Sequence, residues 1–256
     1  MSTSRKNDME PSKSNGTNTE IVNSSWKGIY IIGGVAALLF VVYSIITMIF
    51  LIIFGGQPST VEECFTLLQN NRIIGLMRLD LLTVLVMPLY YLIFFAIYSA
   101  LKRTEDAYVS LATILVFVGV TLFLATPSAY SMISLSDKYA VASTDVQRHQ
   151  LLAAGEALLA SDMWHGTGAI IGGILLQSAT VLISVVMLRT KIFSKVTAYV
   201  GILTHGLDLV HIIIGLFLPG VGVILMAIAG PLYLIWFPLI GQRLLQIGLK
   251  GGGVKT

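Results

Sequence analysis

The chain has 256 residues, of which 55% are hydrophobic and only 11% are charged, and its mean hydropathy is +0.85. Soluble domains carry about 25% charged residues, so this composition predicts an integral membrane protein. The net charge of +3 does not indicate a nucleic-acid partner, because the basic residues stand in short connections beside hydrophobic runs. The single cysteine, Cys64, excludes a disulfide within one chain and a thiolate metal cluster.

The N-terminal residues 1–26 are rich in Ser, Asn, Thr and Lys and contain almost no large apolar side chains. Such a segment cannot bury enough apolar surface to offset the entropy of ordering, so we expect a flexible tail. The apolar run that follows, 29–54, is longer than the roughly 7 to 15 residues of a signal-peptide core and lacks a small-residue cleavage site. It is therefore predicted to remain as the first membrane helix.

Six apolar runs are each long enough to cross about 30 Å of hydrocarbon as a helix. The predicted spans are residues 29–54, 73–101, 109–135, 165–188, 196–217 and 221–245. They predict an all-α fold, a six-helix transmembrane bundle formed by residues 27–250. Gly168 and Gly172, four residues apart in the fourth run, are a pair of small residues at which two helix backbones can approach closely.

The connection between the third and fourth runs is predicted to contain a helix of its own. Thr144 and Gln147 have the spacing of a capping box, and leucines recur at helical spacing after them. We therefore expect an amphipathic helix over 145–160. It could lie on the outer membrane interface or cover the end of the bundle, and the first is the commoner use of such a segment.

The distribution of basic residues predicts the orientation in the membrane. Twelve Lys and Arg residues fall on one side of the six runs and three on the other, with Arg78 left out because it lies within a run. The larger group is Arg5, Lys6, Lys13, Lys27, Lys102, Arg103, Arg189, Lys191, Lys195, Arg243, Lys250 and Lys255, and the smaller group is Arg72, Lys138 and Arg148. Since cytoplasmic loops are enriched in Lys and Arg, both termini are predicted to be cytoplasmic, with the protein in the plasma membrane.

The fifth run carries an aspartate, Asp208, with His205 and His211 three residues to either side. At about 100° per residue these three side chains fall on one helix face together with Thr204. An aspartate at the centre of a membrane helix is disfavoured by about 2.5 to 3.5 kcal/mol, so such residues face the protein interior or a water-filled cavity. The face is predicted to bind or conduct a proton, a cation or a small polar ligand.

Two further polar positions belong to the predicted interior. Asp80 shares a face of the second run with other polar side chains, while Arg78 points about 160° away from it. If the hydrocarbon begins at Leu81, however, both are ordinary interface residues, and this alternative stays open. Gln177 lies near the middle of the fourth run, where we expect it to form a hydrogen bond between helices.

Whether the histidines hold a metal is left open by the sequence. His205 and His211 do not have the i, i+4 spacing of zinc-binding helices. A site would need His165, or a carboxylate from another helix, to meet Asp208 and one histidine. The chain contains no Gly-rich phosphate loop and no nucleophile elbow, and nothing in it requires a cofactor.

Several stretches carry a resemblance to a known family. They run from Asn71 to Leu82, from Leu151 to Ala160 and from Leu188 to Leu203, and the second predicted span ends in Leu101-Lys-Arg103. These stretches resemble an uncharacterised family of small prokaryotic multi-pass membrane proteins, a domain of unknown function. The resemblance implies an all-helical bundle with about this number of spans and supplies no substrate or catalytic residue.

Three classes of function therefore stay open. The first is binding or conduction at the face of Asp208, and the second is a structural or regulatory membrane subunit in which the same face only ties helices together. The third, an intramembrane hydrolase, is the least favoured because no catalytic signature accompanies the polar face. The expected partners are the lipid bilayer and a small ion or polar ligand, with no nucleic acid; formation of a homo-oligomer stays open.

Overall fold

The computed structural model describes residues 24–126, 129–162 and 164–250, which form helices and turns without any strand. The helices of these ranges are α1 (Ser24–Phe54), α2 (Val61–Asn70), α3 (Arg72–Arg78), α4 (Leu81–Val86), α5 (Leu89–Leu101), α6 (Asp106–Ala125), α7 (Ala129–Ala140), α8 (Asp145–Leu159), α9 (Thr167–Leu188), α10 (Lys195–Gly215) and α11 (Pro219–Lys250). Six helical segments of the described chain are long and apolar enough to cross a membrane. The predicted all-α fold with six spans is confirmed at this level.

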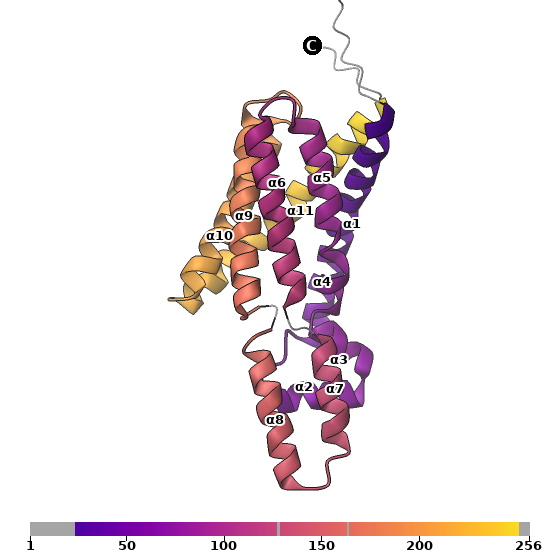
Figure 1. The fold of residues 1–256 in the computed structure, drawn as a ribbon, viewed down its shortest axis with the longest axis vertical. Helices are drawn as coiled ribbons and strands as arrows, with labels where there is room; N and C mark the ends of the chain where they lie inside the picture. The colour runs from indigo at the N-terminus through magenta and orange to yellow at the C-terminus, as the bar shows by residue number, and fades with distance from the viewer. Residues whose placement is uncertain (1–23, 127–128, 163, 251–256) are drawn as a thin grey trace, which may run out of the picture.

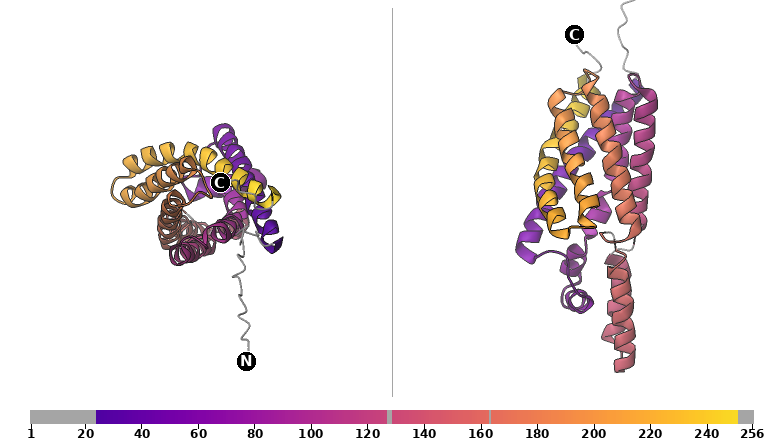
Figure 2. Two further views of the ribbon diagram at one scale, coloured as in Figure 1. Left: turned by 90° about the horizontal axis from the view of Figure 1, so that it is seen from above. Right: turned by 90° about the vertical axis from the view of Figure 1, so that its left-hand side faces the viewer.

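The long helices pack side by side as a ring, in the order α1, α5, α6, α9, α10, α11 and back to α1. The start of α1 and the end of α11 lie at the same end of this bundle, which we call the terminal end (Figure 1). Helices α7 and α8 project from the opposite end, which we call the hairpin end (Figures 1 and 2). An even number of crossings accounts for the shared position of the two chain ends.

Aromatic side chains from several helices fill part of the bundle interior. The ring centroids of Phe40 in α1 and Phe237 in α11 are 4.5 Å apart, and Tyr90 of α5 lies 4.8 Å from Phe40. Trp236 and Phe94 are also fully buried in this cluster. Since each large aromatic side chain buries 150 to 250 Å² of surface, the cluster contributes strongly to holding α1, α5 and α11 together.

Glycines allow α6 and α9 to approach closely. A Cβ atom added to Gly119 of α6 would lie 2.6 Å from the carbonyl oxygen of Gly172, and a Cβ on Gly172 would lie 2.6 Å from that of Gly119. A Cβ on Gly168 would stand 2.7 Å from Thr126 Oγ1. The expectation that Gly168 and Gly172 mark a close helix contact is confirmed.

The predicted second span, 73–101, is not one continuous helix. The chain leaves the helical conformation at Asp80, whose φ of 63° lies in the left-handed region, and the membrane-spanning segment begins at Leu81. Helix α3 is instead held against α2, because Arg78 donates to Glu63 at 2.8 Å and to the carbonyl oxygen of Gly56 at 2.8 Å. Asp80 and Arg78 therefore precede the candidate membrane-spanning segment, and their position at the membrane interface stays a prediction.

The predicted third span, 109–135, lies within a candidate membrane span of residues Asp106–Ala140 that contains two helices. Helix α6 ends at Ala125, and the residues from 129 onward form α7, which packs against α2 and α8 rather than within the bundle (Figure 1). Buried apolar side chains explain this position, since Phe65 of α2 and Met132 of α7 belong to a separate small core. Hydropathy does not reveal where α6 ends, because α7 also begins with apolar residues.

The predicted helix 145–160 and the end of the predicted tail 1–26 also have counterparts in the structure. The predicted helix 145–160 corresponds to α8, whose N-cap residue Thr144 accepts a hydrogen bond from the N–H of Gln147 at 3.2 Å. Of the predicted tail 1–26, residues 1–23 lie outside the described residues, whereas Ser24 already belongs to α1. The first helix thus begins earlier than predicted.

Candidate functional site

Asp208 lies on the face of α10 that meets the two neighbouring helices of the bundle. Its Oδ2 accepts a hydrogen bond from Gln177 Nε2 of α9 at 2.6 Å and a second from the Tyr233 hydroxyl of α11 at 2.7 Å. The Gln177 amide also donates to the Tyr233 oxygen at 3.1 Å. The carboxyl is therefore directed to other helices of the same chain, as the helical-wheel argument predicts.

The same glutamine extends the network to His205. Gln177 Oε1 lies 2.6 Å from His205 Nδ1. An ionised carboxylate can only accept, so the Gln177 nitrogen must face Asp208 and its oxygen must face the histidine. We assign the hydrogen of His205 to Nδ1 on this ground. One amide thus links Asp208 to His205 through hydrogen bonds.

His205 is completely buried. Its ring lies edge-on to Tyr233, with centroids 5.2 Å apart, and to Trp236, with centroids 4.6 Å apart. Complete burial among uncharged side chains favours the neutral imidazole, whose Nδ1–H can donate to Gln177. His205 is therefore a neutral donor to Gln177, not a countercharge for Asp208.

The Asp208 carboxylate has no ion-pair partner among the described residues. Its two hydrogen-bond donors, Gln177 and Tyr233, are uncharged. His211 lies one turn further along α10, where its Nδ1 is 2.9 Å from the carbonyl oxygen of Gly222 at the start of α11. This bond joins the two helices, so His211 has a structural contact of its own.

Thr204 does not join the network. It is fully buried, but its hydroxyl donates to the carbonyl oxygen of Val200 one turn earlier in the same helix, at 2.7 Å. A threonine that bonds within its own helix satisfies its hydroxyl and offers no donor to Asp208. The role of Thr204 in binding therefore stays a prediction, without support from a hydrogen bond to Asp208.

Asp80 and His165 belong to a second cluster at the hairpin end. Trp164 Nε1 donates to Asp80 Oδ2 at 2.6 Å, and His165 Nδ1 lies 2.9 Å from Asp162 Oδ1. Gln57 Nε2 completes the cluster by donating to Asp162 Oδ2 at 2.8 Å. Burial, opposed by the Trp164 hydrogen bond and assisted by the charge of Asp162, raises the pKa of Asp80 to about 6.

The metal site considered from the sequence is not formed. His165 is largely exposed at the hairpin end and bonds to Asp162, so it does not meet Asp208 and a second histidine. Across the described ranges no three His, Cys, Asp or Glu side chains come together in a way that could hold a metal ion.

Sequence reasoning missed two residues near His205, Tyr233 and Trp236. Tyr233 completes the network, and Trp236 and Ser184 face the same point on α10. A Cβ on Gly201 would stand 2.5 Å from Trp236 Nε1 and closer still to Ser184 Oγ, so only glycine fits there. A tyrosine in the middle of the sixth apolar run was the one available signal for Tyr233, because buried tyrosine hydroxyls usually have a partner.

No family model, no curated protein and no solved structure matches this chain. The resemblance to a family of small prokaryotic membrane proteins stays a prediction, and the candidate site is interpreted from its own geometry.

Proposed function

We propose that the protein binds and exchanges a proton at Asp208 within the membrane, with Gln177, Tyr233 and His205 holding the carboxyl in place. One observation carries this proposal: a carboxyl group in a membrane span has only neutral hydrogen-bond donors and forms no ion pair with a described residue. An uncompensated charge in a low-dielectric interior is costly. Uptake of one positive charge removes that cost.

A proton fits this site better than a metal cation does. Cations such as Ca²⁺ and Mg²⁺ need six or more oxygen ligands, whereas the groups nearest to Asp208 direct N–H and O–H hydrogens toward it. These hydrogens would repel a metal cation, but they leave the other oxygen of the Asp208 carboxyl able to carry a proton. Intramembrane Asp and His residues serve as proton relays in other membrane proteins.

Hydroxyl groups support access from the hairpin end. The Tyr43 hydroxyl of α1 lies 2.6 Å from Oγ1 of Thr83 in α4, and Thr83 follows Asp80 by three residues. Tyr90 follows on α5, where its ring contacts those of Phe40 and Phe237, and the Phe237 ring in turn stacks on that of Tyr233. We infer that protons reach Asp208 along this side of the bundle interior.

We further propose that the terminal end faces the cytoplasm of a prokaryotic plasma membrane. The surplus of Lys and Arg in the connections at that end supports this orientation. The hairpin end then lies outside, and α8 lies at or beyond the outer membrane interface. The resemblance to a prokaryotic membrane-protein family agrees with this location.

A structural tie between helices is the second candidate function. It is favoured by the completeness of the network, in which Asp208, Gln177 and Tyr233 all have partners on different helices. Hydrogen bonds between membrane helices contribute about 0.6 kcal/mol each on average. A role as a tie needs the hydrogen bonds of Asp208 but not its ability to ionise, and this difference separates the two candidates.

The variant Asp208→Asn distinguishes proton exchange from a structural tie. Its amide oxygen still accepts hydrogen bonds from Gln177 and Tyr233, but the amide cannot take up a proton. The protein is reconstituted in liposomes that contain a pH-sensitive dye, and proton flux is followed after an imposed pH difference. The expected result is flux in the natural protein, no flux in Asp208→Asn, and unchanged flux in Glu156→Gln. Glu156 is an exposed carboxyl on α8 and is the matched control.

Natural flux in Asp208→Asn would overturn the proposal. Absence of flux in every variant, together with a loss of thermal stability in Asp208→Leu but not in Asp208→Asn, would assign the tie instead. Stoichiometric zinc or iron in the purified protein would bring back the metal-dependent hydrolase.

A further inference from the structure

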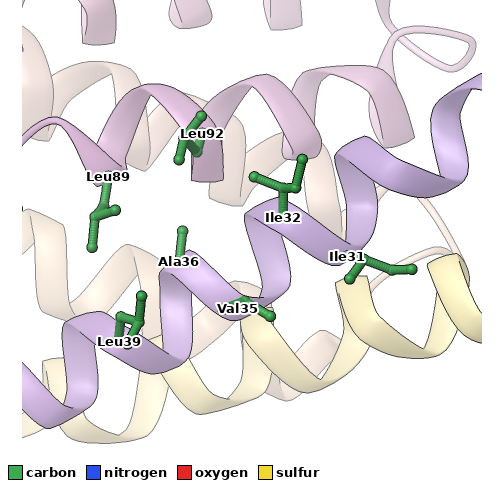
Figure 3. Close-up of a pocket in the computed structure, with 7 residues that line it drawn as sticks. All are labelled: Ile31, Ile32, Val35, Ala36, Leu39, Leu89 and Leu92. Atoms are coloured by element: carbon green, nitrogen blue, oxygen red, sulfur yellow. The ribbon is translucent and has the colours of Figure 1, made fainter.

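An apolar groove opens on the lipid-facing side of the bundle between α1 and α5. Its volume is about 240 Å³, and its lining includes Ile31, Val35, Ala36 and Leu39 of α1 with Leu89 and Leu92 of α5 (Figure 3). Val35 and Leu92 are 45% and 43% exposed, so the groove is open to the side rather than enclosed. Its lining suits a hydrocarbon chain.

Aromatic and basic side chains stand where this groove approaches the terminal end. The ring of Trp26 on α1 lies 6.0 Å from that of Phe95, one turn beyond Leu92 on α5. Lys102 Nζ is placed over the Trp26 ring, 3.9 Å from its centroid. Tryptophan prefers the level of the lipid headgroups, so Trp26 indicates where hydrocarbon gives way to headgroups. The contact with Trp26 holds the Lys102 ammonium at that level.

The positive charge at this position is not compensated within the described residues. Lys102, Arg103 and Lys27 form no ion pair with another described residue. The nearest acid along the chain, Glu105, is paired with Arg189 at 3.3 Å. The surface where α1 and α5 meet headgroups therefore carries a net positive charge directly beyond an apolar groove.

We propose that this surface is a binding site for one anionic phospholipid, with an acyl chain in the groove and the phosphate of its headgroup at Lys102. Basic pockets between membrane helices bind anionic headgroups through charge attraction, and the groove adds apolar contact for the chain. The site lies between α1 and α5, at residues other than those that bond to Asp208, and does not depend on the role of Asp208.

The experiment uses the full chain purified in an uncharged detergent. Thermal unfolding is measured while phosphatidylglycerol or phosphatidylcholine with the same acyl chains is added, and bound lipid is counted by native mass spectrometry. Phosphatidylglycerol is expected to raise the unfolding temperature and to remain bound to the protein. It should do so at a lower concentration than phosphatidylcholine. Equal effects of the two lipids at all concentrations would overturn the proposal.

Two pairs of variants test the two parts of the site. Lys102→Gln should raise about fivefold the phosphatidylglycerol concentration that gives half of the maximal rise in unfolding temperature. The reason is that one lysine near an anionic surface contributes about 1 kcal/mol to binding. Lys191→Gln, at an exposed lysine in the connection between α9 and α10, should leave it unchanged.

Leu92→Trp fills the groove and should abolish retention of phosphatidylglycerol, whereas Leu111→Trp on the exposed face of α6 should not. The proposal is wrong if Lys102→Gln behaves like Lys191→Gln, or if Leu92→Trp retains lipid as the natural protein does. Both tryptophan substitutions replace side chains that already face lipid, so the fold is expected to tolerate them.

Discussion

Gly201 is the position at which a single methyl group tests the packing around His205. In Gly201→Ala the new Cβ would stand 2.5 Å from Trp236 Nε1 and closer still to Ser184 Oγ. The side chains of Ser184 and Trp236 must therefore change rotamer, or helices α9 and α11 must move away from α10. Inserting a methyl group into a close-packed interior costs about 1 to 3 kcal/mol. Gly206→Ala is the matched control on the same helix, because nothing lies within 4 Å of its added Cβ.

Both substitutions gain the same helix propensity of alanine over glycine, up to about 1 kcal/mol, so this gain cancels when the two are compared. Gly201→Ala should therefore be less stable than Gly206→Ala by about 1 to 3 kcal/mol. Unfolding by denaturant in detergent micelles, followed by tryptophan fluorescence, measures the difference. The packing described for His205, Ser184 and Trp236 is refuted if Gly201→Ala is as stable as Gly206→Ala.

Three further predictions concern the hairpin end. Burial raises the pKa of Asp80 from 3.8 to about 6, so the folded protein binds this proton more tightly than the unfolded chain does. The free energy of unfolding should therefore fall as the pH rises from about 4 to about 6. In Asp80→Asn this part of the profile of stability against pH should be flat. Because Asp80 has a positive φ, Asp80→Gly should be more stable than Asp80→Ala by about 1 kcal/mol in thermal unfolding. Burial also raises the pKa of the Cys64 thiol to about 11, so a maleimide should label Cys64 only after denaturation, and rapid labelling of the native protein would contradict its buried position.

The sequence was sufficient to predict the features that depend on local pattern. Composition and run length predict six spans, and the position of Asp208 on a polar helix face predicts that it points into the protein. The bond from Gln177 to Asp208 agrees with the expected hydrogen bond between helices. Each of these inferences needs only the cost of a polar group in hydrocarbon, which acts on every residue of a span.

Features that depend on contacts between distant segments could not be predicted. The break at Asp80 follows from the binding of Arg78 to Glu63 and Gly56, and the position of α7 follows from a small core shared with α2. Hydropathy does not distinguish apolar residues that face lipid from those that face such a core. Tyr233 was missed for a related reason, since its partner Asp208 lies on a different helix.

The most direct test of the account is the infrared absorption of the Asp208 carboxyl group, followed against pH in the reconstituted protein. We predict that the band of a protonated carboxyl changes with pH, and that this change is absent in Asp208→Asn and present in Glu156→Gln. A spectrum that does not change with pH, or a change that persists in Asp208→Asn, would contradict proton exchange at this residue.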